Sequence, residues 1–332
     1  MFIVDDHPTR SDRGFVSLEG SSLPGLHVLL ASPRGFCAGV RRAIDAVRDA
    51  LRLHGAPVYV RRAIVHNRMV VEELKSEGAI FVDELDEVPA KAVLVLSAHG
   101  VAPAIAKEAE RRGFIVYDAV CPLVAKVHRE VERHFQDGRH VVLVGHAGHP
   151  EIEGTLGHLP EGAVTLVSSA ADIDRLPFDA DARLGVAVQT TYSVEEAADI
   201  TEALARRFTD LAEPSSDDIC YATTNRQAAV REIAKRADQV IVVGEAFSSN
   251  ACRLAEVAAS AGCSRVQLVP DASAIEWPLI LSESTLGLTA AASTPDRAVD
   301  AVLTALAGRY DVRLEALGEK TEPARFKRVS IG

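Results

Sequence analysis

Three cysteines are the residues of this sequence best suited to chemistry. Cys37, Cys121 and Cys220 lie far apart in the chain, and each falls between an apolar run and a helical pattern. A thiol at the start of a helix lies in the positive field of that helix, which favours the thiolate. The sequence therefore predicts three related units, each offering one thiolate.

Polar loops recur at matching places in the three units. In each unit a strand pattern follows the cysteine helix and ends in one polar loop, and a later strand ends in another. The carboxyl ends of parallel strands collect ligands, so we expect these loops to meet the cysteines at one site. The polar side chains concerned are His66, His99, His149, Thr190, Ser248, Ser249, Asn250 and Ser293.

Alternating strand and helix patterns position these residues. Short apolar runs predict strands, and amphipathic stretches between them predict helices. The fold expected is α/β, with three pseudo-symmetric lobes whose mostly parallel sheets surround a central cavity. The predicted strands are residues 27–31, 57–60, 80–82, 93–96, 114–117, 140–144, 185–188, 239–243 and 286–288. The expected divisions are a flexible N-terminal extension (1–25), three lobes (26–119, 120–215 and 216–310) and a C-terminal tail (311–332).

Three converging thiolates indicate a metal centre. Zinc is one reading, although catalytic zinc sites commonly include an imidazole or a carboxylate. An iron–sulfur cluster of the [4Fe–4S] type with one open iron also suits three cysteines. Ordinary buried cysteines are the alternative to both, and the threefold repeat weighs against it. Cys252 and Cys263 fall in and just after a helical pattern and are interpreted as packing residues.

The polar loops suit an anionic ligand. Donors beside helix N-termini bind phosphate oxygens, and a diphosphate among three histidines would raise the imidazole pKa values. Glu151 is the one carboxylate of the set. It is either a general acid in a closed site or a helix N-terminal glutamate favoured by the dipole, and the chemistry alone leaves both readings open.

Composition and net charge limit the kinds of partner that the protein could bind. The chain has 332 residues, 48% hydrophobic content and a formal net charge of −11. This charge argues against nucleic acid or an anionic membrane as the main partner. No apolar run reaches the length of a spanning helix, and five widely spaced cysteines do not indicate a disulfide framework. We therefore expect a protein of the cytoplasm.

Several motifs together resemble one known family. Pro-Arg-Gly-Phe-Cys-Ala-Gly-Val at residues 33–40 is the first of them. The others are residues 65–68, 97–101, 121–124, 145–151, 189–191, 218–223 and 248–250. In this order, over about residues 27–305, they resemble the 4-hydroxy-3-methylbut-2-enyl diphosphate reductases of the LytB family.

The resemblance implies specific roles. Cys37, Cys121 and Cys220 would hold a [4Fe–4S] cluster, and ferredoxin or flavodoxin would supply two electrons singly. The products would be isopentenyl and dimethylallyl diphosphate, formed in the last step of the non-mevalonate isoprenoid pathway. The residues implied in catalysis are Glu151, Thr190 and His149. Those implied in substrate binding are His66, His99, His149, Thr190, Ser248, Ser249, Asn250 and Ser293.

The chain departs from the family pattern at a few positions. The family usually has Asn at Phe247, a Ser-Asn-like pair at Ala251 and Cys252, and Gly at Ala291. These departures motivate an alternative: a non-catalytic iron–sulfur protein that senses an isoprenoid diphosphate. A zinc hydrolase acting on a phosphate ester is a third reading.

Overall fold

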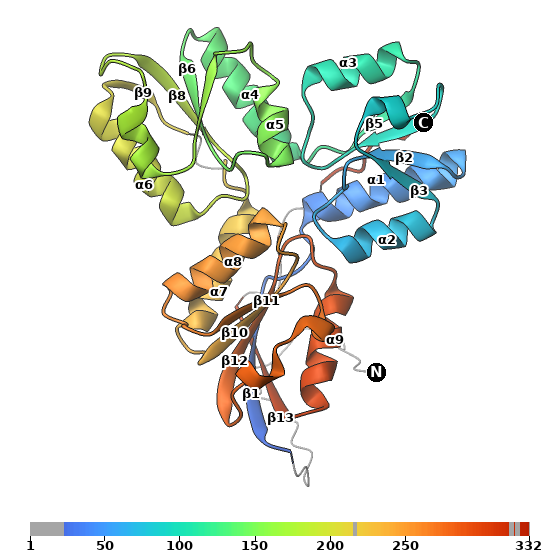
Figure 1. Ribbon diagram of the computed structural model, residues 1–332, viewed down its shortest axis with the longest axis vertical. Helices are drawn as coiled ribbons and strands as arrows, with labels where there is room; N and C mark the ends of the chain where they lie inside the picture. Colours follow the sequence, from blue (N-terminus) through green and yellow to red (C-terminus); the bar gives the residue numbers. More distant parts are fainter. Residues whose placement is uncertain (1–22, 215–217, 319–321, 323–325, 332) are drawn as a thin grey trace.

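The computed structural model describes residues 23–214, 218–318, 322 and 326–331. Most of the extension predicted at residues 1–25 lies outside this range. Within the described residues, three parallel sheets form three lobes, which confirms the predicted fold class (Figure 1). Every strand pair in them is parallel.

The first lobe contains a four-stranded sheet of order β3-β2-β4-β5. Its strands are β2 (Val58–Arg61), β3 (Ala79–Val82), β4 (Val93–Leu96) and β5 (Ile115–Asp118). Its helices are α1 (Ala38–His54), α2 (Arg68–Ser76) and α3 (Pro103–Arg111).

The second lobe repeats this arrangement, with the order β7-β6-β8-β9. Its strands are β6 (His140–Val144), β7 (Val164–Val167), β8 (Arg183–Val188) and β9 (Asp210–Ala212). Its helices are α4 (Pro122–Gln136), α5 (Pro150–Leu156) and α6 (Val194–Arg207).

The third lobe has five strands in the order β11-β10-β12-β1-β13. These are β1 (Gly25–Ala31), β10 (Gln239–Val243), β11 (Val266–Val269), β12 (Ser284–Ala290) and β13 (Asp311–Leu317). Its helices are α7 (Tyr221–Ala234), α8 (Ser249–Ser260) and α9 (Asp296–Ala307).

Two predicted boundaries need correction. The sequence analysis assigned the first strand to the first lobe, but β1 pairs with β12 and β13 in the third, where Figure 1 shows it in blue among orange and red strands. In its sheet β1 lies beside β12, as β5 lies beside β4 and β9 lies beside β8 in the other two sheets. The predicted tail at 311–332 likewise begins with β13, an edge strand. Periodicity indicates that a strand exists but not which distant strand pairs with it.

Because of this pairing, the chain connects the first lobe to the second, the second to the third, and the third to the first in the same way. The strand before each cysteine belongs to one lobe, and the helix after it packs on the next. Thus β5 ends the first sheet before Cys121, whereas α4 packs on β8 and β6 of the second. With β1 in the third sheet, the same holds for Cys37 and α1. Each cysteine therefore lies at a junction between lobes.

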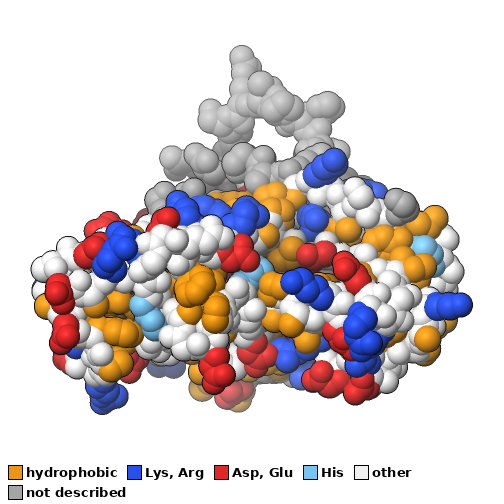
Figure 2. All heavy atoms as spheres, turned by 90° about the horizontal axis from the view of Figure 1, so that it is seen from above, with side chains coloured by type: hydrophobic (Ala, Val, Ile, Leu, Met, Phe, Trp, Pro, Cys, Tyr) orange, Lys and Arg blue, Asp and Glu red, His pale blue; other side chains and the backbone are white. Residues whose placement is uncertain are grey.

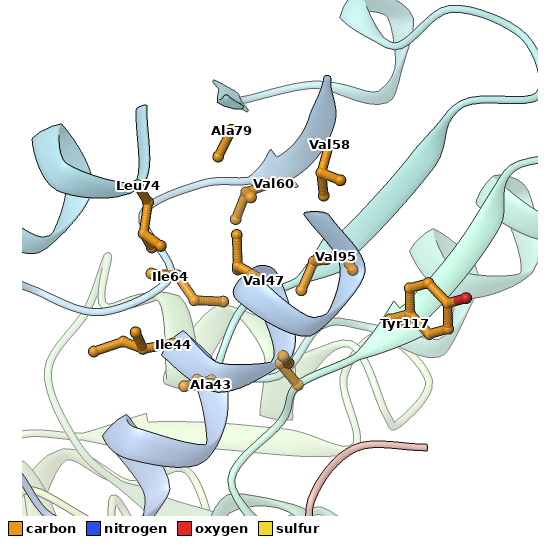
Figure 3. Packing of buried hydrophobic residues seen from close by; sticks show 14 of the residues in the cluster. Ala43, Ile44, Val47, Val58, Val60, Ile64, Leu74, Ala79, Val95 and Tyr117 are labelled. Atoms are coloured by element: carbon orange, nitrogen blue, oxygen red, sulfur yellow. The ribbon is translucent and has the colours of Figure 1, made fainter. Parts of the chain in front are cut away.

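Apolar contacts hold each helix on its sheet. In the first lobe, Ile44 and Val47 of α1 lie against Val60 and Val95 of the sheet, with Leu74 of α2 beside them (Figure 3). The helix side chains recur at helical spacing, so one face of α1 is buried. Truncating a fully buried side chain of this kind costs about 2–5 kcal/mol. This packing fixes α1 and the cysteine at its start.

Polar contacts join the lobes in pairs. Arg62 Nη1 lies 2.5 Å from Glu153 Oε2 between the first and second lobes. Arg253 Nη1 lies 2.6 Å from Glu196 Oε2 between the third and second. Basic and acidic side chains are interspersed on the face shown in Figure 2. Among the described residues, no helix has the length and apolar character needed to cross a bilayer.

Candidate active site

All three predicted cysteines are the N-cap residues of helices. Cys37 precedes α1, Cys121 precedes α4 and Cys220 precedes α7. The Val40 N–H donates to Cys37 Sγ at 3.4 Å. The sequence analysis expected these helix-start positions, where free N–H groups stabilise negative charge on sulfur.

Gly39 leaves space beside two of the thiols. A Cβ added at this glycine would lie 2.8 Å from Cys121 Sγ and 3.8 Å from Cys37 Sγ. The two sulfurs therefore converge on the same point from different lobes. Any larger residue at this point of α1 would push against Cys121.

The charge of each thiolate acts on the others. Burial, followed by charge on Cys37, raises the pKa of Cys220 to about 11. Burial also raises the pKa of Cys121 to about 12, and both other thiols contribute. Such thiols need a cation to ionise together, so the donor set fits an iron–sulfur cluster. Among the described residues, no three His, Cys, Asp or Glu side chains gather tightly around one point as a single metal ion requires.

Three of the predicted histidines meet at the junction of the first two lobes. His66 follows β2, His99 follows β4, and His149 caps α5. The His66 ring centroid lies 4.1 Å from that of His99 and 5.1 Å from that of His149. The sequence analysis placed these residues in equivalent loops, and the structure brings their rings together.

Each ring carries a buried nitrogen that has no hydrogen-bond partner among the described residues. These atoms are Nε2 of His66, Nδ1 of His99 and Nε2 of His149. Burial lowers the pKa of His66 to about 4 and that of His149 to about 3, and it lowers the His99 pKa well below its usual value. Buried polar atoms normally have hydrogen-bond partners. The three nitrogens are therefore suited to a polar ligand, and an anion would draw protons onto the rings.

The Glu151 side chain is 2% exposed and held by Thr190. Its Oε1 accepts from the Thr190 backbone N–H at 2.7 Å, and its Oε2 accepts from the Thr190 hydroxyl at 2.8 Å. Burial raises the pKa of Glu151 to about 7, although both hydrogen bonds lower it. A carboxyl group with this pKa can donate and accept protons near neutral pH. This property favours the general-acid interpretation.

A continuous set of contacts connects the His149 imidazole to the backbone of Cys220. The Glu151 N–H donates to His149 Nδ1 at 3.2 Å, and Thr190 bonds to the Glu151 carboxylate. The Thr190 carbonyl in turn accepts from the Cys220 N–H at 3.1 Å. The His149 imidazole, the Glu151 carboxyl group and Cys220 are thus linked by one set of contacts in the second lobe and at its junctions.

The remaining predicted residues from the third lobe hold the site together. Ser293 Oγ donates to the His66 carbonyl at 3.0 Å. The Thr191 hydroxyl donates to Ser249 Oγ at 3.1 Å, which joins the second lobe to the third. Ser248 caps α8. The Asn250 amide oxygen accepts from the Ala292 N–H at 2.8 Å. All four polar side chains already have partners within the protein.

The unusual positions fall into two groups. Ala251 and Ala291 are fully buried, and their Cβ atoms lie beside Gly244 in the core of the third lobe. Phe247 is 50% exposed, and its ring centroid lies 6.2 Å from that of His66 in an edge arrangement. Only Phe247 of these three borders the histidines.

Sequence reasoning missed two supporting residues. Gln189 accepts from the His146 N–H at 2.9 Å and donates to the Thr191 hydroxyl at 3.0 Å, so it joins two loops of the second lobe. The Thr223 hydroxyl lies 3.3 Å from Cys220 Sγ. Both residues fall in the motifs at 189–191 and 218–223, but only the folded chain shows what they contact.

The fold and the site define a class: a three-lobed α/β protein that joins thiols at helix starts to buried imidazoles and a carboxyl group. A family model described as "LytB protein" matches residues 28–307. The chain belongs to the LytB family and is an oxidoreductase.

Known relatives agree with this assignment. A 4-hydroxy-3-methylbut-2-enyl diphosphate reductase from Beijerinckia indica is 52% identical over 91% of this chain and 95% of its own. The reductase of the same name from Gluconobacter oxydans is 51% identical over 91% of each chain. Among solved structures, the E-1-hydroxy-2-methyl-but-2-enyl-4-diphosphate reductase from Plasmodium falciparum is 35% identical. It has a TM-score of 0.86 over 92% of this chain and 96% of its own.

Proposed function

We propose that this protein removes the allylic hydroxyl of 4-hydroxy-3-methylbut-2-enyl diphosphate to give isopentenyl and dimethylallyl diphosphate. Two electrons and protons are consumed, and water leaves. Relatives at about half identity carry the name of this activity. The single observation that best supports the proposal is the contact path from His149 through Glu151 and Thr190 to Cys220. It joins anion binding, proton transfer and thiol chemistry.

In this proposal Cys37, Cys121 and Cys220 hold a [4Fe–4S] cluster. When bound, the cluster would supply electrons one at a time and a Lewis-acidic iron for the substrate's hydroxyl. The space at Gly39 beside two of the sulfurs and the position of each thiol at a helix start support this assignment.

The histidines would bind the diphosphate. His66, His99 and His149 each have a buried unpartnered nitrogen, which supports donation to phosphate oxygens. Ser248, Ser249, Asn250 and Ser293 fix the surrounding loops and would add donors after a local rearrangement. Holding the diphosphate places the other end of a short substrate near the thiols.

Glu151 would deliver the proton to the leaving hydroxyl. Its buried carboxyl group is partly protonated near neutral pH, and Thr190 fixes its orientation through both oxygens. A positioned acid of this kind lowers the barrier to C–O cleavage because the hydroxyl then leaves as water. His149 orients the start of the helix that carries Glu151.

The electron donor in this proposal is a ferredoxin or a flavodoxin, and the compartment is the cytoplasm. All five cysteines are free in the structure, which suits a reducing environment.

The direct experiment is anaerobic turnover. Iron and sulfide are first measured in the purified protein, and a reduced viologen then supplies electrons to the hydroxymethylbutenyl diphosphate. Formation of the two five-carbon diphosphates is the expected result. Binding without turnover in an iron-replete sample would instead favour the sensor alternative, for which the exposed Phe247 beside His66 is the relevant observation. Zinc without sulfide would favour a hydrolase.

A further inference from the structure

The hydroxyl of Tyr221 is a buried polar group without a partner. Tyr221 is the first residue of α7 and directly follows Cys220. Its Oη is inaccessible to solvent and makes no hydrogen bond within the part of the chain that the structure describes. A buried tyrosine hydroxyl usually has a partner, because leaving it unpaired is costly. The position beside a cysteine indicates that a bound group completes it.

The groups around this hydroxyl identify the partner. Burial raises the pKa of Tyr221, and negative charge on Cys37, Glu322, Cys220 and Cys121 raises it further. The Glu322 carboxylate is already occupied by Arg226, whose Nη1 lies 2.7 Å from Oε1. The remaining neighbours are the three thiols, so the hydroxyl lies at the edge of their site.

The C-terminal segment fixes the Tyr221 ring. The Phe326 ring centroid lies 6.5 Å from that of Tyr221. Beyond it, the Lys327 carbonyl accepts from Arg42 Nε at 2.9 Å, and Val329 and Ile331 pack against the first-lobe core. The C-terminus is marked beside β5 in Figure 1, although the last strand of the chain is in the third lobe.

Two arginines link this segment to the loops of Cys37 and Cys121. Arg226 is 1% exposed and donates to the Gly35 carbonyl at 2.7 Å, two residues before Cys37, while also binding Glu322. Arg226 belongs to α7, the helix that Cys220 caps. Arg42 donates to the Val120 carbonyl at 2.8 Å, next to Cys121. Through these two arginines, Glu322 and Lys327 are linked to the loops that carry Cys37 and Cys121.

We propose that the Tyr221 hydroxyl donates a hydrogen bond to a sulfur of the iron–sulfur group held by the three cysteines. Phe326 holds the ring in the donating position. This inference rests on the proposed cluster. A hydrogen bond to cluster sulfur stabilises the reduced, more negative state, so the bond raises the reduction potential. Tyr221 thereby tunes electron acceptance in the reductase.

The test is a redox titration of Tyr221→Phe monitored by electron paramagnetic resonance. We expect iron and sulfide content equal to that of the unmodified protein and a midpoint potential shifted to more negative values. Phe326→Ala should shift the potential in the same direction, because the ring loses its support. Tyr117→Phe is the matched control: its hydroxyl lies 2.7 Å from His54 Nε2 in the first lobe, and its removal should leave the potential unchanged.

An unchanged potential in Tyr221→Phe with full cluster content would overturn this inference and leave the proposed function intact. An equal shift in Tyr117→Phe would overturn it as well, because the effect would then be general. If the Tyr221→Phe protein holds little iron, the midpoint potential of Phe326→Ala is the deciding measurement. An unchanged potential in that variant would contradict the inference. Absence of a cluster from the unmodified protein would overturn both proposals.

Discussion

Glu151 accepts two hydrogen bonds from Thr190, one from the backbone N–H at 2.7 Å and one from the hydroxyl at 2.8 Å. Both carboxylate oxygens are thus fixed by a single residue from another loop of the same lobe. Burial keeps the pKa of this carboxyl group near 7 despite the two bonds. The pair combines fixed geometry with a proton that is exchangeable at neutral pH.

Replacing Glu151 by Gln should nearly abolish turnover. The amide keeps the size and most of the hydrogen bonding of the side chain but cannot release a proton, so a loss of about 10²–10⁴-fold in kcat is expected. Iron content and the affinity for substrate should stay close to those of the unmodified protein. Single-turnover assays on iron-replete samples measure this. Unchanged turnover would remove Glu151 from the proton path.

The pH dependence of kcat should show the titration of the Glu151 carboxyl group. The acid form of Glu151 is lost as the pH rises through about 7, so kcat should fall across that range. In Thr190→Val the side-chain hydrogen bond that lowers the Glu151 pKa is removed and the backbone one remains. The alkaline limb of the kcat profile should therefore move to higher pH. A limb that stays in place would assign it to another group.

Local elements were predictable from the sequence, but their long-range partners were not. The strand at residues 140–144 is confirmed as β6, since a short apolar run is sufficient evidence for a buried strand. The prediction that β1 belongs to the first lobe was wrong, because sheet membership depends on pairing with β12 and β13, near the other end of the chain. The short β13 alternates Val312, Leu314 and Ala316 with charged residues, a pattern typical of an edge strand.

The same limit applies to the site. Equivalent loops predicted that His66, His99 and His149 would gather, and their rings do. Their unpartnered nitrogens and lowered pKa values could not be predicted, because burial depends on the packing of two lobes. The role of Ser293 as a donor to the His66 carbonyl is similarly a property of the folded chain.

Diphosphate binding should take up protons. His66 and His149, with pKa values of about 4 and 3, are neutral at pH 7 in the free protein. A bound anion raises these values, so the complex holds more protons than the free protein, and affinity should increase as the pH falls from 8 to 6. Calorimetry with inorganic pyrophosphate in buffers of different ionisation enthalpy measures the uptake. His66→Gln should reduce it, and equal uptake in this variant would exclude His66.

Gly39→Ala should impair cluster incorporation while leaving the fold intact. Alanine is favoured in a helix by about 1 kcal/mol, so α1 itself gains stability. The new Cβ, however, would lie 2.8 Å from Cys121 Sγ and displace that thiol. Iron and sulfide analysis after anaerobic reconstitution tests this. Gly308→Ala, where a Cβ makes only ordinary contact at 3.5 Å, is the control. Full iron content in Gly39→Ala would contradict the proposed cluster position.

Phe247 should slow the release of ligands from the histidines. Its ring borders His66 and is 50% exposed, so it can screen one side of the imidazole from solvent. A charged contact that is screened from water is stronger, and a gain of about 1 kcal/mol corresponds to about fivefold in affinity. In Phe247→Asn, pyrophosphate should dissociate about fivefold faster, as measured by stopped-flow displacement.

The matched control is Phe135→Asn, because Phe135 is a similarly exposed ring at the end of α4 and should leave the dissociation rate unchanged. Thermal stability should change little in either variant, since neither ring is fully buried. Equal dissociation rates in Phe247→Asn and the unmodified protein would mean that the ring points away from bound ligand. Faster dissociation with unchanged turnover chemistry would show that Phe247 retains diphosphates, a property that an active reductase and the sensor alternative would share. Turnover, and not affinity, therefore distinguishes these two functions.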